Sequence, residues 1–306
     1  MCAALALAAT GARAEDCAPA AGLRLSHYRA VFLECRNDAG EPRLATRAMD
    51  SGDGPLLLTV DPQRLTTRLA RAACWRCAPT SDAEQADTRF LRALHPAEDA
   101  IRPAVLKNAG LLHGRGDGSF VTGDLCPSRK PLDRGFLERL AREQPGAPVA
   151  LAVSGYWMQT HRADLTWLKS KATEDALAIT WVNHSYTHPY RPGRSDAQTY
   201  LLTPGIDLDR ETLGVERVMI ENGVTPSVFF RFPGLVADDG LMDKIRARHL
   251  VALGADSWIA LGPPPRPGSI VLVHPNGNEP QGLALFERLL GKGRVPKPFR
   301  PIDEAP

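Results

Sequence analysis

The sequence lacks a strong excess of either charge, because 37 Lys and Arg residues are matched by 35 Asp and Glu residues. It also lacks a basic run with interleaved aromatic residues, so the composition gives no case for nucleic-acid binding. No apolar run approaches the roughly 20 residues of a transmembrane segment, and no repeat or low-complexity tract is found. What remains is an ordinary globular composition, with 24% charged and 43% hydrophobic residues. The 306 residues suffice for one large domain or two modest ones.

The first residues, MCAALALAATGARAEDC, form a short apolar run that closes on Ala12-Arg13-Ala14. This ending is typical of a secretory signal peptide with an A-x-A cleavage site, although the usual positive n-region is missing. We predict that residues 1–14 are removed and that the protein is secreted or periplasmic. The alternative is a frayed, Ala-rich N-terminus.

Removal of residues 1–14 would leave five cysteines, and export would favour disulfides among them. An odd number leaves at least one thiol unpaired, and the sequence does not determine the pairing. Cys74-Trp-Arg-Cys77 has the spacing of a redox motif. A redox site of this kind occurs at a strand-to-helix turn, whereas this motif follows the segment LTTRLARAA. We therefore expect these cysteines to be structural.

The chain divides into parts that differ in their pattern of apolar and polar residues. Residues 15–105 contain short apolar runs between Gly-, Pro- and Asp-rich breaks and show no motif to which chemistry can be attached. From about Gly118 short apolar runs alternate with amphipathic helical patterns, which is typical of βα units around a parallel sheet. We assign residues 106–295 to an α/β fold, a (β/α) barrel, and residues 296–306 to a C-terminal tail. The expected strands are SFVTGD, VALAVSG, LAITWVNH, SVFFRFPG, LVALGADSW and SIVLVHPNG, and the expected helices are RGFLERLARE, ADLTWLKSKA, DRETLGVERVMIENG, DGLMDKIRARHL and PQGLALFERLL.

Polar residues follow the apolar part of each expected strand. In a (β/α) barrel the carboxyl ends of all strands open on one face, so these side chains should converge there. The residues in question are Asp124, Ser154, His184 with His188, Arg231, Asp256 with Trp258, and His274.

Two of these histidines lie four residues apart in the stretch LAITWVNHSYTHPY. Residues 178–182 are β-branched and aromatic enough to predict a buried strand, and Pro189 argues against a helix through the second histidine. His184 and His188 are therefore expected in a tight loop at the mouth of a strand. A pair of imidazoles in such a loop favours a metal site.

Five short blocks occur along the chain: TGDLCP at 122–127, NHSYTHP at 183–189, RFPG at 231–234, DSW at 256–258 and LVH at 272–274. Blocks of this kind in this order resemble the motifs of the polysaccharide deacetylase family, also called the NodB-homology or carbohydrate esterase 4 family. The second block is the most specific, since Asn-His-Ser/Thr-x-x-His-Pro is close to the family pattern throughout. The resemblance covers roughly residues 118–290 and leaves the first hundred residues unaccounted for.

The resemblance implies a deformed (β/α) barrel that removes acetyl groups from the N-acetylated sugars of a glycan with a divalent metal, usually zinc. His184 and His188 would hold the metal, because two neutral imidazoles suit zinc and leave positions open for water and a carbonyl oxygen. The metal would lower the pKa of its water and polarise the amide.

The remaining roles follow from the same resemblance. Asp124 would take the proton from water, and His274 would protonate the departing amine. Arg231 would keep Asp124 ionised and oriented, because an adjacent cation favours the charged carboxylate. The expected substrate-binding residues are Trp258, as a wall of the site beside His274, together with Asp256 and Pro233.

The first block departs from the family pattern, which has two consecutive aspartates, the first as base and the second as metal ligand. Here Asp124 occupies the first position and Leu125 the second, and leucine cannot bind a metal. Three outcomes follow: Asp124 itself ligates the metal, Cys126 or a water supplies the missing ligand, or the site holds metal weakly or not at all. Cys126 would be a soft ligand that zinc accepts, although a disulfide or a small buried residue is its expected role. If Leu125 faces the site, Leu125→Asp should increase the affinity for metal.

Two alternatives to glycan deacetylation remain on this sequence. The same fold could hydrolyse the non-peptide C–N bond of a small amide. The chain could also be a non-catalytic carbohydrate-binding protein that has lost its metal site through Leu125. The presence of Asp124, both loop histidines and His274 favours catalysis, because binding alone needs no acid–base pair.

Overall fold

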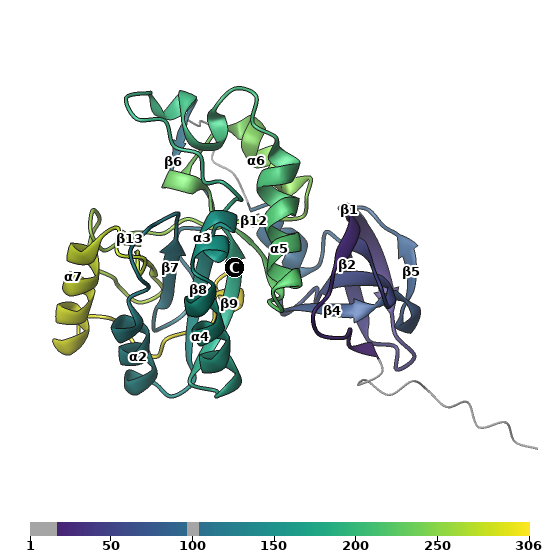
Figure 1. Ribbon diagram of the computed structural model, residues 1–306, viewed down its shortest axis with the longest axis horizontal. Helices are drawn as coiled ribbons and strands as arrows, with labels where there is room; N and C mark the ends of the chain where they lie inside the picture. The colour runs from purple at the N-terminus through teal and green to yellow at the C-terminus, as the bar shows by residue number, and fades with distance from the viewer. Residues whose placement is uncertain (1–16, 97–103) are drawn as a thin grey trace, which may run out of the picture.

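The computed structural model describes residues 17–96 and 104–306, so the expected signal segment 1–14 lies outside the described residues. An N-terminal β-sheet unit stands beside a larger unit in which helices surround a second sheet, and α5 (Val215–Glu221) lies between the two (Figure 1). Within the described residues, no helix is both long and apolar enough to cross a membrane.

The larger unit is built on a sheet of seven strands that all pair in parallel. In spatial order they are β12 (Val251–Ala252), β10 (Pro226–Phe230), β9 (Leu177–Asn183), β8 (Ala147–Val153), β7 (Phe120–Leu125), β14 (Ile270–Val273) and β13 (Ser257–Trp258). β7 and β8 are buried at every position, as expected for central parallel strands whose two faces are covered. The expected deformed (β/α) barrel is confirmed by this topology.

The strands β12 and β13 lie at opposite ends of the sheet, although only residues 253–256 separate them along the chain. The segment LVALGADSW was expected to be a single strand, and this prediction is wrong. An extended chain advances at most about 3.6 Å per residue, so the two ends of the sheet lie within about 18 Å of each other. The sheet is therefore curled, and residues 253–256 bridge the gap that would otherwise leave the barrel open.

The amphipathic patterns expected to be helical do form helices, and α3, which was not expected, begins directly after β8. The helices are α1 (Arg89–Leu94), α2 (Arg134–Glu143), α3 (Gly155–Thr160), α4 (Arg162–Thr173), α5, α6 (Asp239–Arg246) and α7 (Pro280–Gly291), with a π-helical turn at Arg210–Gly214 and 3₁₀ turns at Ala72–Cys74, Asp196–Gln198, Tyr200–Leu202, Pro233–Leu235 and Ile302–Glu304. The side chains of Asp133, Ser154 and Asp238 cap α2, α3 and α6 by accepting backbone N–H bonds in the first turn. Phe136 of α2 and Phe286 of α7 meet edge to face, with ring centroids 5.3 Å apart.

The N-terminal unit is an antiparallel sheet in the order β4–β3–β2–β1–β5, and two short strands, β6 and β11, pair separately. The bounds are β1 (Leu25–Arg36), β2 (Pro42–Ser51), β3 (Gly54–Val60), β4 (Thr67–Arg71), β5 (Arg76–Pro79), β6 (Leu106–Lys107) and β11 (Val236–Ala237). Leu25, Met49, Leu56 and Leu58 form an apolar cluster on one face of this sheet, and Ile220 of α5 joins it. The sheet therefore packs on the barrel through α5.

Disulfides are confirmed, and each cysteine of the C-x-x-C motif has a different partner. Cys74 pairs with Cys17, and Cys77 pairs with Cys35. Cys35 and Cys77 lie directly opposite each other in the β1–β5 ladder, so the register itself brings the two thiols together. The motif thus fastens the N-terminal sheet and provides no redox dithiol, in agreement with the structural role expected from the sequence.

Residues 296–306, expected to be a C-terminal tail, are an integral part of the barrel. Phe299 forms a parallel bridge with Ser119, and the Arg300 N–H donates to the Ser119 carbonyl at 2.9 Å. Phe299 and Ile302 are buried, each in a different apolar cluster of the barrel. The apolar side chains of this segment explain why it packs on the barrel, because burying them stabilises the folded state relative to leaving them in water.

A fully buried ion pair joins the N-terminal sheet to the barrel. The guanidinium of Arg47, on β2, donates from Nε and Nη2 to the two carboxylate oxygens of Glu216 on α5, at 2.6 and 3.0 Å. Both side chains are only 1% exposed. Tyr28 donates a further hydrogen bond to Glu216 at 2.9 Å, and Nη1 of Arg47 donates to the carbonyls of Thr46 and Arg248. The pair is thus well compensated, and removal of either partner would leave a buried charge.

We expect Arg47→Met to lower the free energy of unfolding by about 3–5 kcal/mol, because it leaves the Glu216 carboxylate buried and unpaired. Chemical denaturation followed by circular dichroism measures this change. The matched control is Arg36→Met, which removes the exposed Arg36–Glu34 pair of the same sheet and should change the free energy by less than about 1 kcal/mol. Equal effects of the two substitutions would contradict the role given to Arg47.

Candidate active site

The candidate site begins at the carboxyl end of β7, where alternate side chains point to opposite faces of the sheet. Val121 and Leu125 belong to the apolar cluster that α2 and α7 cover, whereas Thr122 and Asp124 point to the barrel interior. There the guanidinium Nη1 of Arg231 donates to Thr122 Oγ1 at 2.6 Å and to Asp124 Oδ1 at 2.8 Å. The expected contact between Asp124 and Arg231 is present.

The carboxylate of Asp124 is buried, with 3% exposure. Burial alone would raise its pKa, but the positive charge of Arg231, with further help from His184 and His274, brings the pKa of Asp124 below its ordinary value. Asp124 is therefore ionised at neutral pH even though it is inside the protein. An ionised, buried carboxylate with one oxygen held by arginine is suited to accept a proton at the other oxygen.

His184 follows the last residue of β9 and is oriented by the backbone. Its Nδ1 lies 2.9 Å from the carbonyl oxygen of Arg231, and its Nε2 lies 3.6 Å from Asp124 Oδ2. A carbonyl can only accept, so Nδ1 carries the hydrogen, and Nε2 presents a lone pair to the site. Burial lowers the pKa of His184 despite the opposing charge of Asp124.

His188 completes the histidine pair, with its ring centroid 4.7 Å from that of His184. Its Nε2 is buried and has no hydrogen-bond partner within the described residues. Burial, with a contribution from His184, lowers the pKa of His188 to about 3, so the ring is neutral. A buried ring nitrogen without a partner costs free energy unless something binds it, and a neutral imidazole nitrogen is a metal ligand.

Donor atoms for a divalent metal converge at this point. One donor atom from each of Cys126, His184 and His188 lies within 4.8 Å of the others, and Asp124, Cys126 and His274 form a second set of this kind. Imidazole, thiolate and carboxylate are the ligands that zinc takes in proteins. The residues present therefore fit the metal that the sequence blocks imply, and Cys126 is the residue that the two sets share.

Leu125 does not face the site. Its side chain is fully buried in the apolar cluster that also contains Phe136, Leu137 and Trp157. The condition on which Leu125→Asp was expected to add a metal ligand is therefore not met, because the strand keeps its regular alternation at this residue and directs the side chain to the helices. Cys126, the next residue, has its Sγ 3.4 Å from His184 Nε2, and burial together with the charge of Asp124 raises the pKa of its thiol well above its ordinary value.

His274, one residue past β14, lies on the other side of Asp124 and has a carboxylate neighbour that the sequence analysis missed. Nδ1 of His274 is 2.9 Å from Glu279 Oε2, a close contact without the alignment of a hydrogen bond. Trp258 donates its indole N–H to the same oxygen at 2.9 Å, and its ring lies 5.6 Å from that of His274. Burial would raise the pKa of Glu279, but the His274 contact lowers it below its ordinary value.

Two of the expected substrate-binding residues are engaged elsewhere. Asp256 Oδ2 contacts His113 Nδ1 at 2.7 Å, and its Oδ1 accepts from the Ile270 N–H at 3.0 Å, so this carboxylate fixes the backbone beside β14. Pro233 is buried at the start of a 3₁₀ turn. The next residue, Gly234, has a φ of +63°, and a Cβ there would overlap the ring of Tyr200, which packs 5.9 Å from His188. The RFPG block thus places an aromatic ring beside the loop between the two histidines.

Glu211 and Asn183 hold the loop between the two histidines, and no sequence pattern points to Glu211. Its carboxylate is buried and accepts hydrogen bonds from the N–H groups of Tyr186 and Thr187 and from the Thr187 hydroxyl. Asn183 accepts from the Ser185 N–H at 3.1 Å and donates to the Thr212 carbonyl and, at 3.4 Å, to Glu216. The loop is therefore anchored before any ligand arrives.

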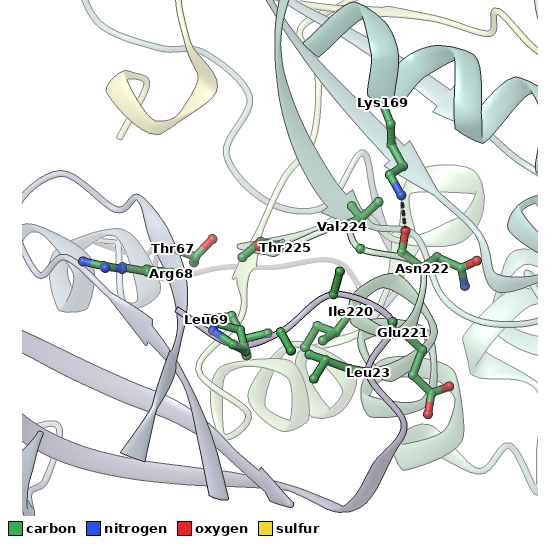
Figure 2. Close-up of a pocket in the computed structure, with 15 residues that line it drawn as sticks. Leu23, Thr67, Arg68, Leu69, Lys169, Ile220, Glu221, Asn222, Val224 and Thr225 are labelled. Atoms are coloured by element: carbon green, nitrogen blue, oxygen red, sulfur yellow. Dashed lines mark hydrogen bonds between the residues drawn. The ribbon is translucent and has the colours of Figure 1, made fainter. Parts of the chain in front are cut away.

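A groove of about 610 Å³ lies elsewhere, at the seam between the N-terminal sheet and α5. Figure 2 shows Leu23, Leu69 and Ile220 at this groove and the Lys169 ammonium donating to the Asn222 carbonyl. Its wall includes Val224 and Thr225, at the amino end of β10, whereas Arg231 follows the carboxyl end. The groove therefore lies at the opposite end of the barrel strands, and its lining contains none of the converging residues described above.

No protein-family model matches the chain. Solved structures that are similar to it include a family 4 carbohydrate esterase from Bacillus anthracis, at 19% identity over 65% of this chain and 87% of that chain, with a TM-score of 0.45. PdaA of Bacillus subtilis, a family 4 carbohydrate esterase, is 16% identical over 64% of this chain and 84% of its own, with a TM-score of 0.46. A family 4 pseudoenzyme from Bacillus anthracis is 17% identical over 62% of this chain and 66% of that chain, with a TM-score of 0.40.

We expect Leu125→Asp to lower the free energy of unfolding by at least about 3 kcal/mol without increasing the affinity for metal, because it places an isolated carboxylate in the apolar cluster. Leu125→Met is the matched control and should cost less than about 1.5 kcal/mol, since the volume is conserved. Chemical denaturation and titration of metal-free protein with zinc measure the two quantities. Tighter zinc binding by Leu125→Asp would show that position 125 reaches the site.

Proposed function

We propose that the protein is a metal-dependent hydrolase that removes N-acetyl groups from a carbohydrate. The observation that carries the proposal is the position of Asp124, a buried and ionised carboxylate held by Arg231 at 2.8 Å, between neutral histidines on one side and His274 on the other. Amide hydrolysis needs a base for water, an acid for the leaving amine and stabilisation of the carbonyl oxygen. This arrangement offers residues for all three, which favours a hydrolase over a protein that only binds glycans.

A divalent metal held by His184 and His188, with zinc as the ion of choice, would polarise the acetyl carbonyl and lower the pKa of a water molecule. Asp124 accepts the proton of that water at Oδ2, while Arg231 keeps Oδ1 occupied and the carboxylate fixed. His274 then donates a proton to the nitrogen of the departing amine. Glu279, which lies 2.9 Å from its Nδ1, holds the ring in position for the transfer.

Aromatic side chains beside the histidine loop support a sugar as substrate. Tyr190 is 59% exposed, and its ring lies 5.3 Å from that of Tyr200, which in turn meets His188 edge-on. Together with Trp258 on the side of His274, these rings offer apolar faces with a polar edge, which suits the alternating apolar and hydroxyl surfaces of a pyranose. A small amide would make no use of them. Two disulfides support a secreted or periplasmic location, where such glycans are found.

The direct test is acetate release from a panel of acetylated glycans, run with metal-free protein and with protein reloaded with zinc. Zinc-dependent release from a glycan, with little from acetylated small amides, is the expected result. Zinc binding without release from any glycan would contradict the proposed activity.

For the base, we expect Asp124→Asn to reduce kcat by about 10²–10⁴-fold, because an amide cannot accept the proton from water. Zinc content and thermal unfolding of the variant are measured in parallel to separate loss of the base from loss of the fold. Asp164→Asn is the matched control, since Asp164 also accepts from an arginine, Arg134 at 2.7 Å, but lies on α4. Substantial turnover by Asp124→Asn would exclude Asp124 as the base.

For the acid, we expect Glu279→Gln to lower kcat, because the carboxylate holds the His274 ring in position through a 2.9 Å contact with its Nδ1. Trp258→Phe removes the other hydrogen bond to Glu279 and leaves the contact with His274 in place, so kcat should fall much less in this variant. A kcat for Glu279→Gln equal to that of the wild-type protein would remove Glu279 from this role.

A further inference from the structure

The thiol of Cys126 is the feature of the site that the proposed mechanism leaves unused. It is the free cysteine of the described residues, because Cys17, Cys35, Cys74 and Cys77 are all paired in the N-terminal sheet. Its side chain is buried, with 8% exposure, and faces His184. The backbone of Cys126 is also fixed, since Asn276, which is fully buried, donates from Nδ2 to its carbonyl at 3.0 Å.

The distance between this thiol and the histidine is that of two ligands on one zinc ion. Zinc bonds of about 2.3 Å to sulfur and about 2.05 Å to nitrogen, at a tetrahedral angle, place the two ligand atoms about 3.6 Å apart. Sγ of Cys126 and Nε2 of His184 are 3.4 Å apart. The hydrogen on His184 Nδ1 is committed to the Arg231 carbonyl at 2.9 Å, so the lone pair of Nε2 points toward the sulfur side.

His188 provides an independent sign of a ligand at the same point. Its Nε2 is buried without a hydrogen-bond partner among the described residues, and its donor atom lies within 4.8 Å of those of Cys126 and His184. One ion bound by the three residues would take a ring nitrogen of His188 as its ligand. Asp124 belongs to a different set of donor atoms, with Cys126 and His274, and its Oδ1 accepts a hydrogen bond from Arg231.

We infer that Cys126 is the third protein ligand of the metal, so that a Cys-His-His set binds the ion and Asp124 stays free to act as the base. The inference rests on the metal dependence in the proposed function. Three protein ligands leave a fourth position for water or substrate, as in other catalytic zinc sites. A thiolate carries the same charge as the carboxylate that Leu125 replaces, but it is softer. The site should therefore favour zinc, cobalt or cadmium over magnesium and manganese.

The test uses the full chain, freed of metal and titrated with Co²⁺ and with Zn²⁺. Cobalt bound to a thiolate gives an intense charge-transfer absorption in the near ultraviolet, which carboxylate and imidazole ligands do not give. We expect this band at one equivalent of cobalt in the wild-type protein. Cys126→Ser should lose the band and bind zinc at least about 100-fold more weakly, since even indirect partners of metal ligands contribute 10–100-fold.

Two further variants sharpen the result. Cys126→Asp should bind metal without the band and should shift the preference toward Mn²⁺, because a carboxylate replaces the thiolate at the same position. Ser128→Ala, two residues along the same loop, is the matched control and should keep both the band and the affinity. Circular dichroism of each metal-free variant verifies that the fold is retained.

The outcomes separate this inference from the proposed function. Metal binding without the band in the wild type, or an unchanged band in Cys126→Ser, overturns the role of Cys126, and zinc-dependent acetate release would then still support the activity. The band without acetate release from any glycan supports the Cys-His-His set and contradicts the activity. A wild-type protein that binds neither cobalt nor zinc overturns both.

Discussion

The buried guanidinium of Arg231 is the interaction on which the site depends. It is fully buried, and its donors reach Thr122 Oγ1, Asp124 Oδ1 and the carbonyls of Leu253 and Gly254. A buried charge of this kind is tolerated only when its hydrogen bonds are made, so the surrounding backbone has little freedom. The side chain therefore ties β7 to the segment that bridges the two ends of the sheet.

Arg231 also links Asp124 to the histidine loop through its own backbone. Its carbonyl faces His184 Nδ1 at 2.9 Å, and this contact decides which ring nitrogen is turned toward Asp124 and Cys126. Closure of the barrel, ionisation of the carboxylate and orientation of the imidazole are thus consequences of one well-compensated cation. This arrangement explains why several polar side chains can be buried together at the end of an otherwise apolar sheet.

The barrel and most of the site residues could be predicted from the sequence because both follow from local patterns. Apolar runs alternate with amphipathic ones, and polar residues at strand ends must meet on one face of a parallel barrel. Asp124, His184, His188, Arg231 and His274 were identified in this way, and the structure brings them together.

The residues that were missed or misplaced depend on contacts between distant parts of the chain. Glu279 precedes α7 as its N-cap and Glu211 lies in the π-helical turn before α5, and only tertiary packing places them against His274 and the histidine loop. The side of the strand on which Leu125 points depends on whether β7 bulges at its end, which its sequence does not reveal. The split of LVALGADSW into β12 and β13 is set by closure of the barrel rather than by local propensity.

The N-terminal sheet supplies no residue to the cluster around Asp124. The pairing of Arg47 with Glu216 nevertheless connects this sheet to the candidate site. Glu216 also accepts from Asn183, the residue directly before His184, and Asn183 fixes the backbone of Ser185. In a barrel without the N-terminal sheet, Glu216 would lose its partner Arg47 and become exposed to solvent. It would still contact Asn183, which directly precedes the histidine loop. The two units therefore cannot be exchanged independently in a chimeric protein unless position 216 is redesigned along with them.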